Sequence, residues 1–380
     1  MNTLSKISGP RDRQRGLSLV ELMIALTVGV ILLAGVVSIF ISSRRSYSTN
    51  NAVSQLQENG RFAMDFITHD TRLAGYMGCA KSITIDNMLS SGSLSSFAFD
   101  FNDPVTGYES TGSAPGNGIA LAANPAAGSG VYTANAAGYP IDPVISGKAI
   151  AGSDVLGIRS SISTPIYVTQ IPASSAANFK VVSVAGIQTG QLGIVTDCVK
   201  GTLFQVTNLV SSSNTVVHSI GSYTPGNSSP NFSESYVGSA MFLQPDTIAF
   251  YIAPGADGSP ALWKADLQLS GTNVQLTPQE LVSGVENMQV LYGIDTTGIQ
   301  TPSQYVTANQ VTNWNQVISI RVGLLLQSNP GAVAQATVPP ASTPCAAGTY
   351  NVLGTCVSAP QDTRLRRVFT ATIGLRTLLP

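Results

Sequence analysis

A run of 20 residues without a charged side chain, Leu22 to Ile41, is the feature that most constrains this 380-residue chain. As an α-helix rising about 1.5 Å per residue, the run spans the roughly 30 Å hydrocarbon layer of a membrane. Four basic residues precede it, and only Arg44 and Arg45 follow it closely. By the positive-inside rule, this asymmetry favours a cytoplasmic N-terminus and places the bulk of the chain outside the cytoplasm.

A cleaved signal peptide and a single-pass anchor are two ordinary interpretations of this start. A signal peptide has an apolar core of about 7 to 15 residues followed by small residues at the cleavage site. The run here is longer and leads into Ser42-Ser43-Arg44-Arg45. A plain anchor explains the length but gives no role to Glu21, an ionisable residue at the edge of the run, where burying a carboxylate is costly.

The segment around this edge reads GLSLVELMIAL, from Gly16 to Leu26. It resembles the class III leader junction of type IV pilins and type II secretion pseudopilins, in which a basic leader ends in Gly and a Glu is the fifth mature residue. The resemblance implies that prepilin peptidase removes residues 1–16 by cutting between Gly16 and Leu17. It also implies N-terminal methylation and an assembly role for Glu21. Leu17 stands where the family usually has Phe.

Cleavage after Gly16 would create a free amine four residues before Glu21. In a medium of low dielectric constant, an ammonium and a carboxylate stabilise one another strongly, within one subunit or between two. An unpaired charge would be costly there. The pair would therefore select one register between neighbouring helices.

The helix is expected to continue past the membrane. After a transmembrane half over 17–42, an amphipathic stalk half over 43–78 has no Pro and contains apolar residues at helical spacing: Val53, Leu56, Ala63, Phe66, Ile67, Leu73 and Ala74. Gly60 interrupts this half at a cost of about 1 kcal/mol relative to Ala. Gly75 is the expected stop signal.

Residues 79–380 are expected to form a globular, mainly β head that is rich in loops. Short apolar bursts bounded by turn residues predict strands within 82–85, 154–159, 165–169, 179–184, 192–195, 247–252, 288–292 and 317–326. The segments 107–153 and 211–240 read as irregular insertions that divide the head into two sub-sheets. The fold class is therefore α+β, a long helix followed by a pilin-like head.

The C-terminal part carries a second resemblance. The segments 281–295, 314–326 and 364–373 resemble the C-terminal half of PilW-type minor pilins, whose relatives in secretion systems are the large J-type minor pseudopilins. Generic sheet strands are the plain alternative explanation. The 200 residues between the two matching regions carry no motif that we recognise.

Four cysteines in a chain of this kind indicate two disulfides, because metal binding would require C-x-x-C spacing or nearby His. Three connectivities are possible. Cys345 and Cys356 most simply close a local loop, which leaves Cys79, at the helix exit, to pair with Cys198 in the head. Such a bond would tie the stalk to the sheet.

Catalytic, cofactor and metal motifs are not expected from this sequence. His69 falls on the polar side of the stalk and His218 in a Ser/Asn-rich turn region, without a local nucleophile or orienting acid. Asp257 and Asp295 read as ordinary turn residues, because neither completes a calcium-loop pattern. We therefore expect no enzyme, no cofactor and no metal site.

Charge also limits the partners. Charged side chains make up only 10% of the chain and its net charge is −1, so no general basic field attracts nucleic acid. A local basic cluster, Arg364, Arg366 and Arg367, reads as a solvated strand end, with Arg364 and Arg366 on one face and Arg367 on the other. Direct DNA binding is not expected.

These features predict a minor pilin that helps initiate, and caps, a type IV pilus. The expected partners are prepilin peptidase, other minor pilins, the major pilin, the inner-membrane assembly platform and a tip adhesin. The protein would reside in the bacterial inner membrane with a periplasmic head, and then at the cell surface in the pilus. One alternative is a minor pseudopilin of a type II secretion system; another, of a different class, is a stand-alone membrane-anchored adhesin or hydrolase.

Overall fold

The computed structural model describes residues 16, 18–79, 83–90, 96–136, 138–170, 176–221, 223–236, 239–335 and 338–375. The predicted cleavage site is only partly within this range, since residues 1–15 and Leu17 lie outside it. The chain divides into two compact units, residues 1–51 and 52–380. We describe each unit by itself.

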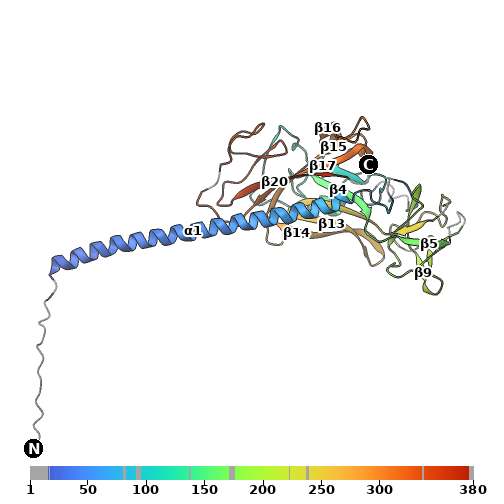
Figure 1. Cartoon of the computed structure of the whole chain (residues 1–380), viewed down its shortest axis with the longest axis horizontal. Coiled ribbons are helices and arrows are strands. Elements are labelled where there is room, and N and C mark those ends of the chain that lie inside the picture. Colours follow the sequence, from blue (N-terminus) through green and yellow to red (C-terminus); the bar gives the residue numbers. More distant parts are fainter. Residues whose placement is uncertain are drawn as a thin grey trace, which may run out of the picture. The chain divides into compact units, whose positions relative to one another are not determined.

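The described part of the first unit is almost entirely helical. Helix α1 (Leu19–Arg72) is 54 residues long and begins in this unit (Figure 1). From Leu19 to Ile41, the large apolar side chains of this helix are exposed. Thr27 satisfies its hydroxyl inside the helix by donating to the carbonyl of Ile24 at 2.9 Å, so the apolar run has no unmet side-chain hydrogen bond at this position.

The second unit begins with the C-terminal part of α1, which has one buried stripe. The stripe comprises Ala52, Leu56, Gly60, Ala63, Ile67 and Thr71, spaced three or four residues apart. The sequence also suggested Phe66 and Leu73 as part of the apolar face, and this is wrong: they are 44% and 38% exposed. Spacing alone could not separate two adjacent apolar stripes.

Helix α1 ends a few residues before the predicted limit of the stalk. Regular helix stops at Arg72, and residues 73–75 form a turn. Gly75 has a φ of 74°, a left-handed conformation that suits glycine, and its N–H donates to the carbonyl of Arg159 at 2.8 Å. The expected stop signal therefore also fastens the helix end to the head.

Two antiparallel sheets enclose the largest core. The first sheet has the strand order β14 (Asn273–Ser283), β13 (Pro260–Ser270), β12 (Pro245–Pro254), β4 (Val155–Ser161), β2 (Val105–Tyr108). The second has the order β16 (Gln304–Val306), β15 (Val285–Ile294), β17 (Val317–Gln327), β20 (Arg366–Gly374). Residues from both sheets and from the buried stripe of α1 share one hydrophobic cluster.

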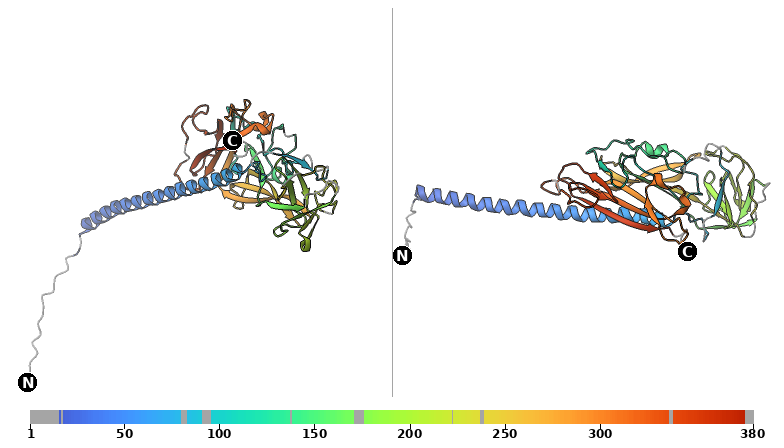
Figure 2. Two further views of the ribbon diagram at one scale, coloured as in Figure 1. Left: turned by 45° about the vertical axis from the view of Figure 1, so that its right-hand side comes forward. Right: turned by 90° about the horizontal axis from the view of Figure 1, so that it is seen from above.

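Two further sheets complete the described head. An eight-stranded sheet has the order β1 (Thr84–Asn87), β8 (Lys200–Gln205), β7 (Leu192–Thr196), β11 (Met241–Leu243), β5 (Ile166–Gln170), β6 (Asn178–Val181), β10 (Thr215–Val217), β9 (Asn208–Val210). The part of this sheet that contains β5, β6, β10 and β9 forms one end of the second unit (Figures 1 and 2). A small sheet has the order β18 (Tyr350–Val352), β19 (Thr355–Ser358), β3 (Gly118–Ala120).

Short helices in the described connections are α2 (Pro143–Ser146), η2 (Ser211–Ser213), η3 (Ala308–Gln310) and η4 (Trp314–Gln316). Within the two segments predicted to be irregular, the regular elements are the end of β2, β3 and α2 in 107–153, and η2 and β10 in 211–240. The predicted fold class, α+β with a long helix followed by a mainly β head, is confirmed. The prediction of two sub-sheets is wrong, because the described residues form four sheets whose pairings join strands far apart in sequence.

Candidate processing and assembly site

Helix α1 begins with a reciprocal cap between Ser18 and Glu21, next to the predicted cleavage site. The backbone N–H of Ser18 donates to Glu21 Oε2 at 3.0 Å, and the N–H of Glu21 donates to Ser18 Oγ at 3.2 Å. This is a capping box, in which residues three apart satisfy each other's exposed backbone donors. The Ser-x-x-Glu signal for this cap is present in the sequence, although we expected Glu21 to act only in assembly.

The cap places the Glu21 carboxylate beside the segment that cleavage would alter. Gly16 precedes the helix as exposed irregular chain, whereas Leu17 lies outside the described residues. Cleavage between them would leave the Leu17–Ser18 peptide bond intact, so the Ser18 N–H would persist. The Glu21 carboxylate would then be bound to the residue that follows the new amine. Opposite charges this close attract each other even through a polar medium.

The apolar part of α1 carries two glycines that no described contact within the chain explains. A Cβ built on Gly29 or Gly35 meets no described atom within 4 Å. Glycine in a helix interior costs about 1 kcal/mol relative to Ala, so its presence is unfavourable for an isolated helix. Small residues let membrane helices approach one another closely, which is the contact we expect these two positions to make.

Polar contacts hold the C-terminal part of α1 against the head. Asn59 Nδ2 donates to the carbonyl of Ser283 at 3.3 Å, and Lys264 Nζ lies 3.4 Å from Asp70 Oδ2. Together with the buried stripe, these contacts make residues 52–72 an integral part of the head. The same helix thus serves two environments.

The two disulfides connect the residues that we expected from the sequence. Cys79 is bonded to Cys198 across 119 residues, and Cys345 to Cys356 across 11. The first bond joins the chain just after α1 to the hairpin between β7 and β8. The second closes the loop that contains β18, which pairs with β19.

Arg366 forms a buried ion cluster that was not expected from the sequence. Its guanidinium donates to both oxygens of Glu286, at 2.7 and 3.0 Å, and to both oxygens of Asp362, at 2.7 and 2.9 Å. The side chains of Arg366 and Glu286 are only 4% and 5% exposed. The prediction of a solvated strand end is therefore wrong at Arg366, because the partner Glu286 lies 80 residues away in sequence.

Neither histidine takes part in a catalytic arrangement among the described residues. His69 is exposed on α1, with Nδ1 2.9 Å from Asp70 Oδ1. His218 follows β10 outside any regular element, is fully buried, and its ring stacks on Phe232 with 3.9 Å between ring centroids. Burial lowers the pKa of His218 to about 4. No group of three or more His, Cys, Asp or Glu among the described residues is placed to hold a metal.

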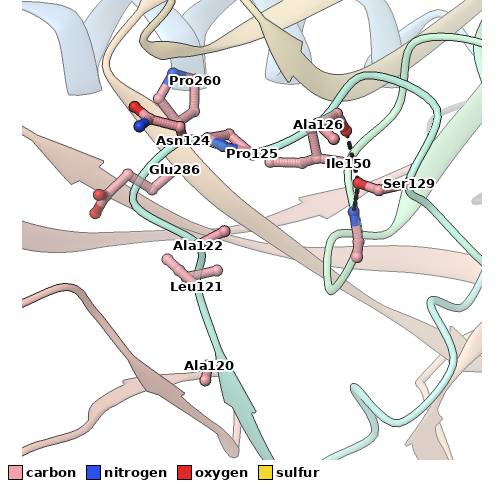
Figure 3. A pocket seen from close by; sticks show the side chains of 11 residues that line it. Ala120, Leu121, Ala122, Asn124, Pro125, Ala126, Ser129, Ile150, Pro260 and Glu286 are labelled. Carbon is pink, nitrogen blue, oxygen red and sulfur yellow. Dashed lines mark hydrogen bonds between the residues drawn. The ribbon is translucent and has the colours of Figure 1, made fainter.

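A cavity of about 280 Å³ is lined by residues of the segment 120–129 and by Ile150, Ala151, Pro260 and Glu286 (Figure 3). Most of its lining is small and apolar, and Glu286 on its wall is held by Arg366. The hydroxyl of Ser129 is occupied by backbone: it donates to the carbonyl of Ala126 at 2.6 Å and accepts from the N–H of Ala151 at 3.1 Å. The lining therefore offers no activated nucleophile, and the cavity does not favour the hydrolase alternative.

Two buried carboxyls, Glu109 and Asp154, meet at the junction of β2, β4 and β15. Ser113 Oγ lies 3.2 Å from an oxygen of each, and Asp154 also accepts the backbone N–H of Ser110 and of Val290 at 2.9 Å. Desolvation raises the pKa of Glu109 to about 8, with repulsion from Asp154 adding to it, and raises the pKa of Asp154 to about 7. Ser113 fixes this pair, and no sequence motif indicated it.

Comparisons with known protein families give matches in the N-terminal and the C-terminal part of the chain. Residues 249–377 match the family described as Type IV Pilus-assembly protein W, and residues 11–37 match the prokaryotic N-terminal methylation motif. Among solved structures, a type IV-like pilin from Thermus thermophilus matches with 19% sequence identity and a TM-score of 0.23, over 36% of this chain and 70% of that one. No curated protein sequence matches the chain.

A methylation motif leading into a long apolar helix, followed by a mainly β head, defines a type IV pilin-like protein. This class is structural rather than enzymatic. Within it, the chain is similar to PilW-type minor pilins over residues 249–377, and the methylation motif supports the wider pilin class. Helix α1 is also long and apolar enough to anchor the protein in a membrane.

Proposed function

We propose that this minor pilin helps initiate a type IV pilus and then caps its tip. The observation that carries the proposal is the size of the head, in which the described residues form four sheets after the long helix α1. Packed helices lie about 8–10 Å apart, so subunits whose helices form a common core bring their heads close together. A head of this size would collide with its neighbours along a thin filament, whereas a tip position leaves one side open.

The N-terminal segment would supply the assembly chemistry. Prepilin peptidase would remove residues 1–16, because a pocket that accepts only hydrogen on Cα at Gly16 excludes any larger residue. The new amine and Glu21 would then neutralise each other within one subunit or between two. Methylation at Leu17 would follow the cleavage. Intact-mass measurement of the mature protein should show the loss of residues 1–16, and a start within or after the apolar run would establish a signal peptide instead.

The proposed partners follow from the same steps. They are the peptidase, the other minor pilins, the major pilin, the assembly platform of the inner membrane and a tip adhesin. The head would lie in the periplasm before assembly and at the cell surface afterwards.

Deletion of the gene tests the proposed function against its alternatives. We expect loss of surface pili with protein secretion intact, restored by the unaltered chain. Loss of secretion with normal pili would instead indicate a type II pseudopilin. Normal piliation and secretion together would leave a stand-alone adhesin or hydrolase.

A further inference from the structure

Strand β20 forms one edge of the second sheet. It pairs with β17 from Ser319 to Gln327 in an unbroken antiparallel register of nine residue pairs. No strand in the described part of the chain pairs with its other side. Figure 1 shows β20 in dark red beside α1.

The register determines which backbone groups of β20 face outward. Leu375 N–H donates to Ile318, the residue opposite it, and Ser328 N–H donates to Leu365 in the same way. In an antiparallel ladder, such hydrogen-bonded pairs alternate with pairs whose N–H and C=O point away. Odd-numbered residues therefore bond to β17. Even-numbered residues, namely Val368, Thr370, Thr372 and Gly374, direct their backbone groups outward, where no described residue accepts them.

The other sheet edges in the described structure are protected, and β20 is not. Edges β1, β2, β3, β9, β16 and β18 are three or four residues long. The remaining long edge, β14, contains Pro278 and Glu280. From Val368 to Gly374, β20 has neither a proline nor a charge nor a bulge. Natural proteins normally blunt such an edge, because a long, regular, uncharged edge strand pairs with another chain.

We propose that β20 binds an extended segment of another subunit of the pilus, which adds a fifth strand to this sheet. Main-chain hydrogen bonds to the even-numbered residues would supply the affinity of such strand addition. The exposed side chains of Thr370 and Thr372 favour an uncharged segment, and Arg367 at the start of the strand favours an acidic residue there. The occupant's identity as a pilus subunit rests on the function proposed above.

A second copy of this chain is disfavoured as the occupant by the direction of α1. Gln55 and Arg364 line the same cleft, and further along both elements Gly60 meets Phe369, so α1 and β20 run in the same direction. Two copies joined edge to edge through a two-fold axis would pair their β20 strands antiparallel. Their α1 helices would then also run antiparallel. Subunits anchored in one membrane in the same orientation cannot adopt that arrangement.

Hydrogen exchange resolved to single amides tests the proposal. The full chain is purified in detergent alone, and separately as the complex that co-purifies from membranes with its minor pilins. In the complex, we expect exchange at Val368, Thr370 and Thr372 to slow by at least about tenfold, as for amides that gain a hydrogen bond. The amides of Phe369 and Ala371 should be slow in both samples and serve as the internal reference.

Two matched variants separate the backbone from the side chain. Thr370→Pro removes one outward N–H without breaking a β17 bond, since edge strands tolerate proline at such positions. Thr370→Val keeps that N–H. We expect at least a tenfold loss of complex with the proline variant and none with valine, while both variants retain the melting temperature of the parent.

Three outcomes are informative. A complex that forms with unchanged exchange at the even-numbered amides overturns strand addition and leaves the proposed function intact. If no complex forms with any pilus subunit, the proposed function itself fails. If Thr370→Pro lowers the melting temperature, Thr372→Pro takes its place in the experiment. A complex yield equal to that of the parent, from a proline variant that keeps the parent's melting temperature, also overturns the proposal.

Discussion

Gly60 on α1 lies directly beneath the ring of Phe369 on β20. A Cβ built on Gly60 would come within 2.4 Å of Phe369 Cζ, which no packed structure allows. Glycine in mid-helix is normally a loss of about 1 kcal/mol. Here it lets a helix and a sheet approach closely.

The first prediction concerns this contact. Gly60→Ala should lower the free energy of unfolding by about 1 kcal/mol, because overpacking costs about 1–3 kcal/mol and offsets the gain in helix propensity. In a Phe369→Leu background, the same Gly60→Ala change should stabilise the protein. Urea unfolding of the detergent-solubilised chain gives the four values of this double-mutant cycle. Stabilisation by Gly60→Ala in the parent background would disprove the close approach.

The second prediction compares the disulfides. Cys79→Ser should destabilise the head more than Cys345→Ser, because the bonds close loops of 119 and 11 residues. On the chain-entropy model the difference is about 2 kcal/mol. Thermal unfolding of the two variants measures it, with non-reducing peptide mapping to show that the remaining bond is intact. Equal losses would mean that the longer loop is already restricted in the unfolded chain.

The third prediction concerns the Glu109–Asp154 pair and pH. The raised pKa values of about 8 and 7 mean that the folded state binds more protons than the unfolded state between roughly pH 4 and 8. This contribution to stability is complete in acid and is lost as the pH rises through the folded pKa values. Glu109→Gln should therefore gain stability relative to the parent as the pH rises, by at most about 1.4 kcal/mol per pH unit.

Unfolding midpoints from pH 5 to 9 provide this measurement. Glu58→Gln, which neutralises an exposed carboxylate on α1, is the matched control and should track the parent. A Glu109→Gln curve parallel to that of the parent would show that the buried pair does not titrate in this range.

The fourth prediction separates the two roles of Glu21. Glu21→Gln keeps an acceptor for the Ser18 N–H but removes the charge, whereas Ser18→Ala removes one capping bond and keeps the charge. Glu21→Gln and Glu21→Ala should both lower the yield of minor-pilin complex, with cleavage, membrane insertion and head folding unchanged. Glu21→Asp should restore the yield only in part, because its shorter side chain misplaces the charge.

Co-purification from membranes and counts of assembled pili measure this effect. Ser18→Ala should assemble better than Glu21→Gln if the charge matters more than the cap. Normal complex and normal piliation with Glu21→Ala would reduce Glu21 to a tolerated polar residue at the membrane edge.

Some features of this protein follow from the sequence because their information is local. Twenty uncharged residues form a helix that can span a membrane whatever follows, and helical spacing placed Leu56, Ala63 and Ile67 on the buried stripe. The predicted disulfides are also present. Pairing the closest cysteines, Cys345 and Cys356, left only one combination for the others.

Other features were decided by contacts between residues far apart in the chain. The β13–β14 hairpin was not singled out, although its turn contains Gly271 at a φ of 63° and alternating residues flank it. Arg366 became a buried residue only because β20 lies next to β17 and so brings it to Glu286.

Local pattern thus determined the membrane helix, its motif and the mainly β character of the head. Tertiary structure decided how the described strands divide into four sheets and which long edge strand has no partner among the described residues. It also decided which polar groups are buried, including Glu109 and Asp154. The physical reason is that a helix satisfies its hydrogen bonds within a few residues, whereas a strand depends on partners that only the folded chain supplies.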